Sequence, residues 1–316
     1  MGRYIARRLL IAIPTLLALS FFIYALVSAA PGDPAEEGAR RISGNEPTDE
    51  QVEQMRKELH LDRPFVLQYV SWLGDAVTGD MGTSFSLRRP VFDVIKERIP
   101  ATLELAGAAF AIIVVASLPL GVLAALFYRR WPDHLLRVVA LAFASMPSFF
   151  FAYLLIIWLV TNLKLLPVAG RQGFDSLIMP AVVVAIGPMA VISRLLRSSL
   201  LEVFGEDYVR TARSKGLTST AVVLRHSLRN AALPVLTVLG TFVGRLLEGV
   251  VITEFIFAWP GLGRLTFEAI SQRDYPMIQA VVILIGTIYV IVNLLVDLSY
   301  SVLDPRIRLE GSHEHV

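Results

Sequence analysis

Three polar residues within one apolar stretch of the sequence could line a polar path. Arg245 and Glu248 stand three positions apart, and Thr241 precedes Arg245 by four, so all three share one helix face. A charge at the centre of a membrane costs about 2.5–3.5 kcal/mol, so this pair needs a partner or a wet cavity. We expect Thr241, Arg245 and Glu248 to line a translocation pathway or outer gate. A mutually neutralised structural pair is the alternative.

A second polar segment, "GEDYVRTARSKGL" at 205–217, has the signals of a short surface helix. Acids at its front and bases at its back complement the helix dipole, and a glycine follows the last turn. We expect a helix of about ten residues outside the bilayer. Small residues one turn apart on it would let another protein approach closely. A solvated loop is the alternative. The residues concerned are Glu206, Asp207, Tyr208, Ala212, Arg213, Lys215 and Gly216.

Motifs of catalysis and cofactor binding are missing from the sequence. It holds no GxxxxGK[ST] phosphate loop, no HExxH and no GxSxG, and its five histidines are scattered. It has no cysteine, and a formal charge of +2 is too small to indicate a nucleic-acid partner. We therefore expect no catalytic residue, no metal site and no cofactor bound by this chain, which is not expected to be an enzyme.

The elements that must position these residues are membrane helices. Of the 316 residues, 55% are hydrophobic and 18% charged, and mean hydropathy is +0.61. The apolar residues form runs of about 20 or more, which is the length that crosses a bilayer. We expect an all-α membrane protein with about six transmembrane helices, near 9–30, 101–128, 135–160, 177–200, 231–257 and 277–303. The first run also resembles a signal peptide, but its length favours an uncleaved anchor.

Basic residues gather in alternate connections between these runs. By the positive-inside rule those connections and both termini are cytoplasmic. The long segment 31–100 then lies outside, where Thr48 and Gln51 have the spacing of a helix capping box. Five prolines within the runs predict kinks. They are Pro119, Pro147, Pro180, Pro188 and Pro234.

Three parts follow from this reading. Residues 1–95 hold the first transmembrane helix and an extracytoplasmic segment. Residues 96–303 form a five-helix core with a cytoplasmic loop at 201–230, and residues 304–316 form a cytoplasmic tail.

Ordered motifs along nearly the whole chain resemble one family. They are "APGDPA" (30–35), "PATLELA" (100–106), "SMPSFF" (145–150), "EDYVRTARSKGLTSTAVVLRHSLRNAALPVL" (206–236), "FAWPGLGRL" (257–265), "RDYPMIQ" (273–279), "NLLVDLSY" (293–300) and "LDPRIR" (303–308). The chain resembles permease subunits of binding-protein-dependent ABC importers, in the dipeptide/oligopeptide/nickel branch. This sequence departs from the family's Glu-Ala-Ala triplet. Arg210, Thr211 and Ala212 stand in its place, so only one alanine is kept. Gly216 matches the family glycine.

The resemblance implies a type I ABC importer permease fold in a bacterial inner membrane. It implies that 205–217 is a coupling helix that docks on an ATPase subunit. It further implies a second homologous permease, two ATPase subunits that carry ATP and Mg, and an external solute-binding protein, beside membrane lipid. The binding protein would dock on 31–100 and on the loop at 258–278, with Trp259, Pro260, Arg273, Asp274 and Tyr275 as expected contacts.

The substrate stays open at the level of sequence. We expect di- or oligopeptides, with nickel, a nickel chelate or glutathione as alternatives. The short connection at 161–176 resembles the nickel and glutathione members more than the dipeptide members. A secondary transporter independent of ATP is a further alternative, but no inverted repeat is evident.

Overall fold

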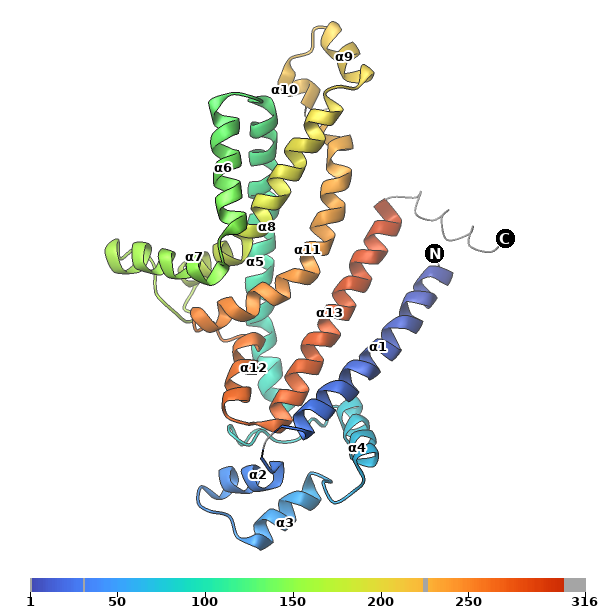
Figure 1. Cartoon of the computed structure of the whole chain (residues 1–316), viewed down its shortest axis with the longest axis vertical. Coiled ribbons are helices and arrows are strands. Elements are labelled where there is room, and N and C mark those ends of the chain that lie inside the picture. The colour runs from blue at the N-terminus through green and yellow to red at the C-terminus, as the bar shows by residue number, and fades with distance from the viewer. Residues whose placement is uncertain (1, 31, 224–226, 304–316) are drawn as a thin grey trace. The chain divides into compact units, whose positions relative to one another are not determined.

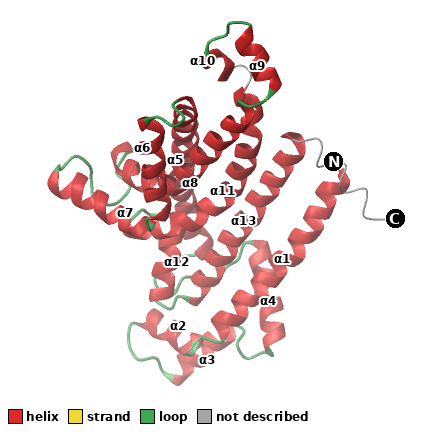
Figure 2. Cartoon of the chain, turned by 45° about the horizontal axis from the view of Figure 1, so that its top comes forward, coloured by secondary structure: helices red, strands yellow, loops and turns green. Residues whose placement is uncertain are grey.

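A computed structural model describes residues 2–30, 32–223 and 227–303, which fold into helices joined by loops (Figures 1 and 2). Within these ranges the only strand-like feature is an isolated bridge between Thr83 and Pro90. In chain order the elements are α1 (Gly2–Ser28), α2 (Pro34–Ser43), α3 (Asp49–Glu58), α4 (Phe65–Thr78), α5 (Val91–Leu126), α6 (Trp131–Ser145), α7 (Ser148–Leu155), the π-helix η1 (Ile156–Asn162), α8 (Phe174–Val203), α9 (Asp207–Ser214), α10 (Ser219–Val222), α11 (Leu228–Ile256), α12 (Leu262–Ser271) and α13 (Tyr275–Leu303).

Four helices are long and apolar enough to cross a membrane. They are α1 from Leu10, α5, α8, and α13 as far as Val296. Two bent pairs raise the number to six if each counts as one span: α6 with α7 and η1, and the two parts of α11. The prediction of an all-α membrane protein with about six spans is confirmed in this sense.

The third expected span, 135–160, is not one helix. The chain turns by 108° between α6 and α7. Met146 is extended at φ −83° and ψ 127°, as the residue before a proline prefers, and Pro147 has no N–H to continue the helix. The 15 residues of α6 reach only about 22 Å, short of a hydrocarbon core of about 30 Å.

The other prolines behave differently. Helix α8 continues through Pro180 and Pro188, and α11 continues through Pro234. The 47° bend of α11 lies between Leu246 and Gly249, three turns after its proline.

The chain forms two compact units. The first comprises residues 1–102 with 260–316, and the second comprises 103–259, so the division falls inside α5. Both α12 and α13 belong with the N-terminal residues in the first unit. The division expected at 95 and 303 stays a prediction. The expected tail at 304–316 lies outside the described residues.

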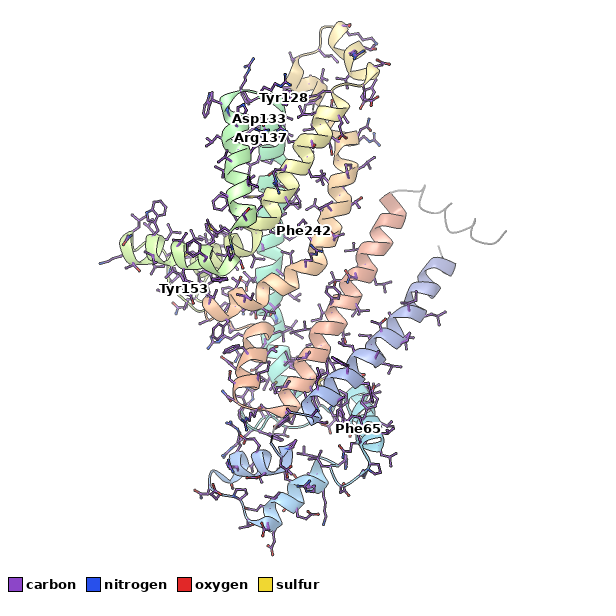
Figure 3. All side chains as sticks on the ribbon, viewed as in Figure 1. Phe65, Tyr128, Asp133, Arg137, Tyr153 and Phe242 are labelled. Carbon is purple, nitrogen blue, oxygen red and sulfur yellow. The ribbon has the colours of Figure 1, made fainter. Side chains whose placement is uncertain are left out.

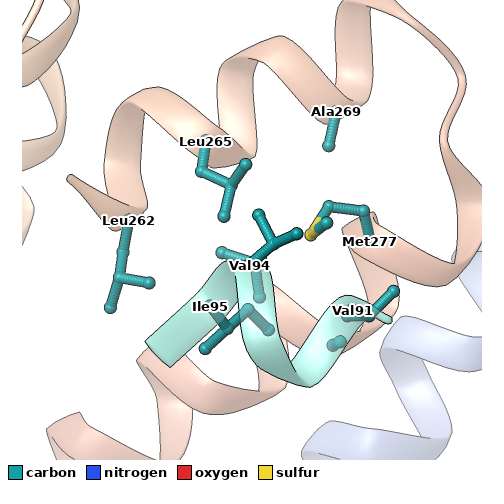
Figure 4. Close-up of a cluster of buried hydrophobic side chains, with 9 residues drawn as sticks. Val91, Val94, Ile95, Leu262, Leu265, Ala269 and Met277 are labelled. Carbon is teal, nitrogen blue, oxygen red and sulfur yellow. The ribbon is translucent and has the colours of Figure 1, made fainter. Parts of the chain in front are cut away.

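The first unit has a buried apolar core where α5, α12 and α13 meet. Val94, Ile95, Leu265 and Met277 lie at its centre, each at most 3% exposed (Figure 4). Helices α1 and α13 run alongside each other (Figure 1). A Cβ on Gly286 would overlap the side chain of Leu19, so the glycine permits this close approach.

The segment between α1 and α5 is ordered. Its helix α3 begins with the expected capping box: the Thr48 N–H donates to Gln51 Oε1 at 2.9 Å, and the Gln51 N–H donates to Thr48 Oγ1 at 3.3 Å. This prediction is confirmed. Helix α4 contacts α1, where the hydroxyls of Ser20 and Tyr69 are 2.8 Å apart.

Candidate functional site

The expected surface helix at 205–217 is present as α9, Asp207–Ser214. It follows α8 after three residues and is followed by α10, beyond the end of α8 in Figure 1. Gly216 has φ +81°, the left-handed conformation that a helix-ending glycine adopts. The predicted helix and its glycine stop are confirmed.

Ala212 does not lie on an open face of α9, contrary to expectation. It is 7% exposed and packs with Val209 and Val222 in a small apolar cluster, against which Val203 also packs. The cause is the i, i+3 spacing of Val209 and Ala212, which gives this polar helix one apolar stripe. This stripe packs α9 against Val222 and Val203, so any partner must approach the opposite face of α9. The role of Ala212 in coupling stays a prediction.

The remaining expected residues of α9 are mostly on its outer surface. Glu206, Asp207 and Lys215 are exposed. Arg210 pairs with Asp207 at 3.5 Å, but both side chains are solvated, and such pairs contribute little. The backbone of Arg213 lies in α9 and its side chain is outside the described residues. Their coupling role stays a prediction.

Tyr208 connects α9 to the start of α11. Its hydroxyl accepts a hydrogen bond from Asn230 Nδ2 at 2.8 Å. Asn230 was not singled out from the sequence, because a polar residue 22 positions away carries no local signal. Helix α9 is thus joined to α8 by three residues on one side and hydrogen-bonded to α11 on the other.

A buried ion pair fixes α6 to α8 ten residues before α9. Arg197 donates to both oxygens of Asp133, at 2.6 and 2.8 Å, and Asp133 is 1% exposed. Asp133 also accepts from the Arg129 N–H at 3.0 Å. The guanidinium of Arg197 lies 5.4 Å from the centre of the Tyr128 ring. Figure 3 labels Tyr128 and Asp133 near the start of α6. Sequence reasoning missed this pair, whose members are 64 residues apart.

Arg245 lines a hollow of about 220 Å³ in the second unit. Met146 and Ser148 from the break between α6 and α7, and Pro188 of α8, line the same hollow. Thr241 is exposed but is not part of this lining, and its hydroxyl donates to the Val238 carbonyl at 2.8 Å. The side chain of Glu248 is outside the described residues, so its pairing with Arg245 stays a prediction, as does the pathway role of all three.

Asp274 joins two segments of the first unit that are far apart in the sequence. Its carboxylate accepts from Ser84 Oγ at 2.5 Å, from Ser86 Oγ at 2.7 Å and from the Ser86 N–H at 3.1 Å. The carboxylate also accepts from the Met277 N–H at 3.3 Å, at the start of α13. Asp274 itself is fully buried. It therefore holds the segment before α5 against the start of α13.

Most of the expected docking residues do not present their side chains outward. Trp259 and Asp274 are fully buried, and Tyr275 is 6% exposed in a cluster with Met55 and Phe85. Their apolar or hydrogen-bonded surroundings explain this burial. Of the five residues, Arg273 is exposed and Pro260 is half-buried. Docking of an external protein here stays a prediction.

Metal ligands do not gather in the described part of the chain. Within residues 2–30, 32–223 and 227–303, no three His, Asp or Glu side chains come together as a candidate site. The arrangement offers a mainly apolar hollow that Arg245 and Ser148 also line, beside helix breaks, and a short helix that contacts the ends of two long ones. It offers no constellation for covalent chemistry among those residues.

Two family models match most of the chain. The model described as "Binding-protein-dependent transport system inner membrane component" matches residues 117–309, and that of the N-terminal part of such membrane components matches residues 1–106.

Curated relatives match at nearly full length. The chain is 41% identical to the dipeptide transport system permease protein DppB of Escherichia coli (strain K12), over 98% of this chain and 99% of the relative. It is 40% identical to the glutathione transport system permease protein GsiC of the same strain, with the same coverage. Among solved structures, the MetNI methionine ABC transporter in an inward-facing conformation matches with TM-score 0.55 at 17% identity. That match covers 67% of this chain and 96% of the other and shows a shared fold.

Proposed function

Because the chain belongs to the family of binding-protein-dependent transport system inner membrane components, we propose that it forms half of a pathway for di- or oligopeptides. The chain is a multi-pass inner-membrane permease subunit of an ABC importer, and ATP hydrolysis belongs to partner ATPases. The observation that carries the peptide assignment is the 41% identity to a dipeptide permease along almost the whole of both chains.

The proposed assembly pairs this chain with a second, homologous permease, two ATPase subunits and an external solute-binding protein. ATP and Mg bind on the ATPase subunits. Both termini face the cytoplasm, which is supported by the basic residues in alternate connections. The binding protein delivers the peptide to the outer side of the two permeases.

Energy enters the chain at α9. An ATPase subunit binds its exposed face, which carries Glu206, Asp207 and Arg210. Because α9 follows α8 directly and Tyr208 bonds to Asn230, a displacement of α9 acts on α8 and α11 together. These two helices pack extensively on each other, and both line the hollow that contains Arg245. Closure of the ATPases thereby changes the shape of the pathway.

Glutathione, itself a tripeptide, is the second candidate substrate, and chain length favours it. The alignment with the dipeptide permease extends over 341 positions, more than the 316 residues of this chain. The alignment with the glutathione permease extends over 308. The dipeptide permease thus carries residues that this chain lacks, whereas the glutathione permease is close to it in length.

Uptake by the reconstituted importer tests the function. Proteoliposomes containing both permeases and both ATPases, with the binding protein outside, are supplied with labelled dipeptide, oligopeptide, glutathione or Ni²⁺. We expect accumulation of a peptide substrate that requires both internal ATP and the binding protein. Accumulation of Ni²⁺ alone would replace the peptide assignment. Accumulation driven by an ion gradient without nucleotide would contradict the importer mechanism.

A further inference from the structure

A second hollow in the second unit lies between α5, α6 and α8 and contains unneutralised cations. Arg137 of α6 and Arg194 of α8 line it together with Arg197. Arg197 is neutralised by Asp133. In the described part of the chain no carboxylate lies within ion-pair distance of Arg137 or Arg194. Arg137 is within 3.2 Å of the ring nitrogen Nδ1 of His134, which is not an acid.

The Nε of Arg194 is buried and meets no hydrogen-bond acceptor among the described residues. A guanidinium in an apolar surrounding normally pairs with an anion, since leaving a buried charged donor unsatisfied costs about 1–3 kcal/mol or more. The rest of the lining is apolar, with Leu120 and Ala124 from α5 and Val139 and Phe143 from α6. The hollow thus combines an apolar wall with two arginines, neither of which forms an ion pair among the described residues.

Its position along α6 corresponds to the depth of lipid headgroups. Trp131 and Tyr128 are exposed at the start of α6, and exposed aromatic residues of this kind are typical of the membrane interface. Arg137 comes six residues after Trp131, about 9 Å along the helix axis. A long arginine side chain reaches back over that distance to the headgroup region.

The surface beside the hollow faces an apolar medium. Leu135, Val138 and Leu141 of α6 are all exposed large hydrophobic residues. The hollow itself measures about 90 Å³. A water molecule takes about 30 Å³ of liquid, so this space can hold a group of the size of a phosphate.

We propose that Arg137 and Arg194 bind the phosphate of an anionic membrane phospholipid, whose acyl chain lies along the exposed apolar face of α6. Basic pockets between membrane helices are suited to anionic headgroups, and arginine forks match phosphate oxygens. The site does not depend on the transported substrate. It clamps α6 to α8 one helical turn from the Asp133–Arg197 pair.

Native mass spectrometry of the intact importer, titrated with phosphatidylglycerol, tests this site. The variant Arg137→Gln/Arg194→Gln is expected to bind phosphatidylglycerol about 30-fold more weakly, since each basic residue near an anionic lipid contributes about fivefold. Arg137→Lys/Arg194→Lys keeps the charges and retains most of the binding. Lys164→Gln removes an exposed cation of the same unit that lies outside the hollow, and we expect it to leave the affinity for phosphatidylglycerol unchanged.

Three outcomes would overturn the proposal. The first is binding of phosphatidylglycerol by the double glutamine variant at the wild-type affinity. The second is displacement of the lipid by inorganic phosphate at equal concentration, which would assign the hollow to a free anion. The third is loss of the second permease from the double glutamine complex with lipid affinity unchanged, which would assign the two cations to a carboxylate of that subunit.

Discussion

Asp274 in the first unit and Tyr208 in the second each join a loop to the start of a long helix, and they do so with very different strength. Asp274 is fully buried and accepts three hydrogen bonds from Ser84 and Ser86. Tyr208 is 40% exposed and makes one side-chain hydrogen bond, to Asn230. Hydrogen bonds to a buried charged group are worth about 1.5–3 kcal/mol, and a neutral bond about 0.5–1.5.

The apolar contacts show the same contrast. The segment around Asp274 adjoins two clusters of buried side chains in the first unit, whereas α9 packs through its own Val209 and Ala212 against Val222 and Val203. The segment around Asp274 is therefore held by more buried contacts than α9. Within the second unit the Asp133–Arg197 pair joins α8 to α6.

The largest expected effect comes from Asp133→Ala, which leaves Arg197 buried without its partner. Removing one member of a buried ion pair destabilises by about 3–5 kcal/mol. Equilibrium unfolding of the purified importer in mixed micelles measures the loss. Asp93→Ala, an exposed acid in the first turn of α5, is the matched control and should be nearly neutral. Equal losses in the two variants would show that the pair does not anchor α8.

Asp274→Ala is expected to cost about 3 kcal/mol, because the donors of Ser84 and Ser86 lose their acceptor. The neighbouring control Arg273→Ala removes an exposed side chain and should change stability little. Both are measured by the thermal midpoint of the purified importer. A midpoint for Asp274→Ala that matches Arg273→Ala would mean that the outer segment is not fixed by this carboxylate.

Ala212→Glu should abolish coupling while the importer stays assembled. Burying an unpaired carboxylate between Val209 and Val222 costs far more than burying a neutral polar group, so we expect α9 to lose its packing against Val222. We expect ATP hydrolysis that no longer responds to the loaded binding protein, measured on the reconstituted complex. Thr211→Glu places the same charge at an exposed neighbouring position and keeps the response. Loss of the response in both variants would show that the added charge, and not the lost packing of α9, disrupts coupling.

Tyr208→Phe should have the smallest effect, about 1 kcal/mol, because one exposed hydrogen bond is lost. Faster amide hydrogen exchange within α9, with no change in α8, is the expected signature. Asn230→Ala combined with Tyr208→Phe should add nothing further, since both remove the same bond. Additive losses in the double variant would show that the two residues act separately.

Local features of this fold were predictable from sequence. The dipole-matched charges and Gly216 predicted α9 and its end, Thr48 and Gln51 predicted the cap of α3, and runs of apolar residues predicted the membrane helices. Each of these depends on residues a few positions apart, so the physics that decides them is visible in a short window.

The missed features depend on contacts between distant parts of the chain. The partners of Asp133 and Asp274 lie 64 and about 190 residues away, and neither pairing has a local signal. Ala212 was read as an open surface because the sequence does not show that Val222 folds back over it. Pro147 predicted a kink, but whether a proline bends a membrane helix depends on its neighbours: Pro180 and Pro188 stay inside α8, and the chain turns 108° at Pro147.

Labelling of single cysteines on α9 tests most directly whether energy enters the chain there. The sequence contains no cysteine, so Arg210→Cys introduces a unique thiol on the exposed face of α9. Membrane vesicles with both permeases, made with or without the ATPase subunits, are treated with a thiol reagent, and Gln272→Cys serves as an exposed control elsewhere. We predict that the ATPases protect Arg210→Cys and leave Gln272→Cys reactive. Equal labelling of Arg210→Cys with and without the ATPases would contradict docking at α9.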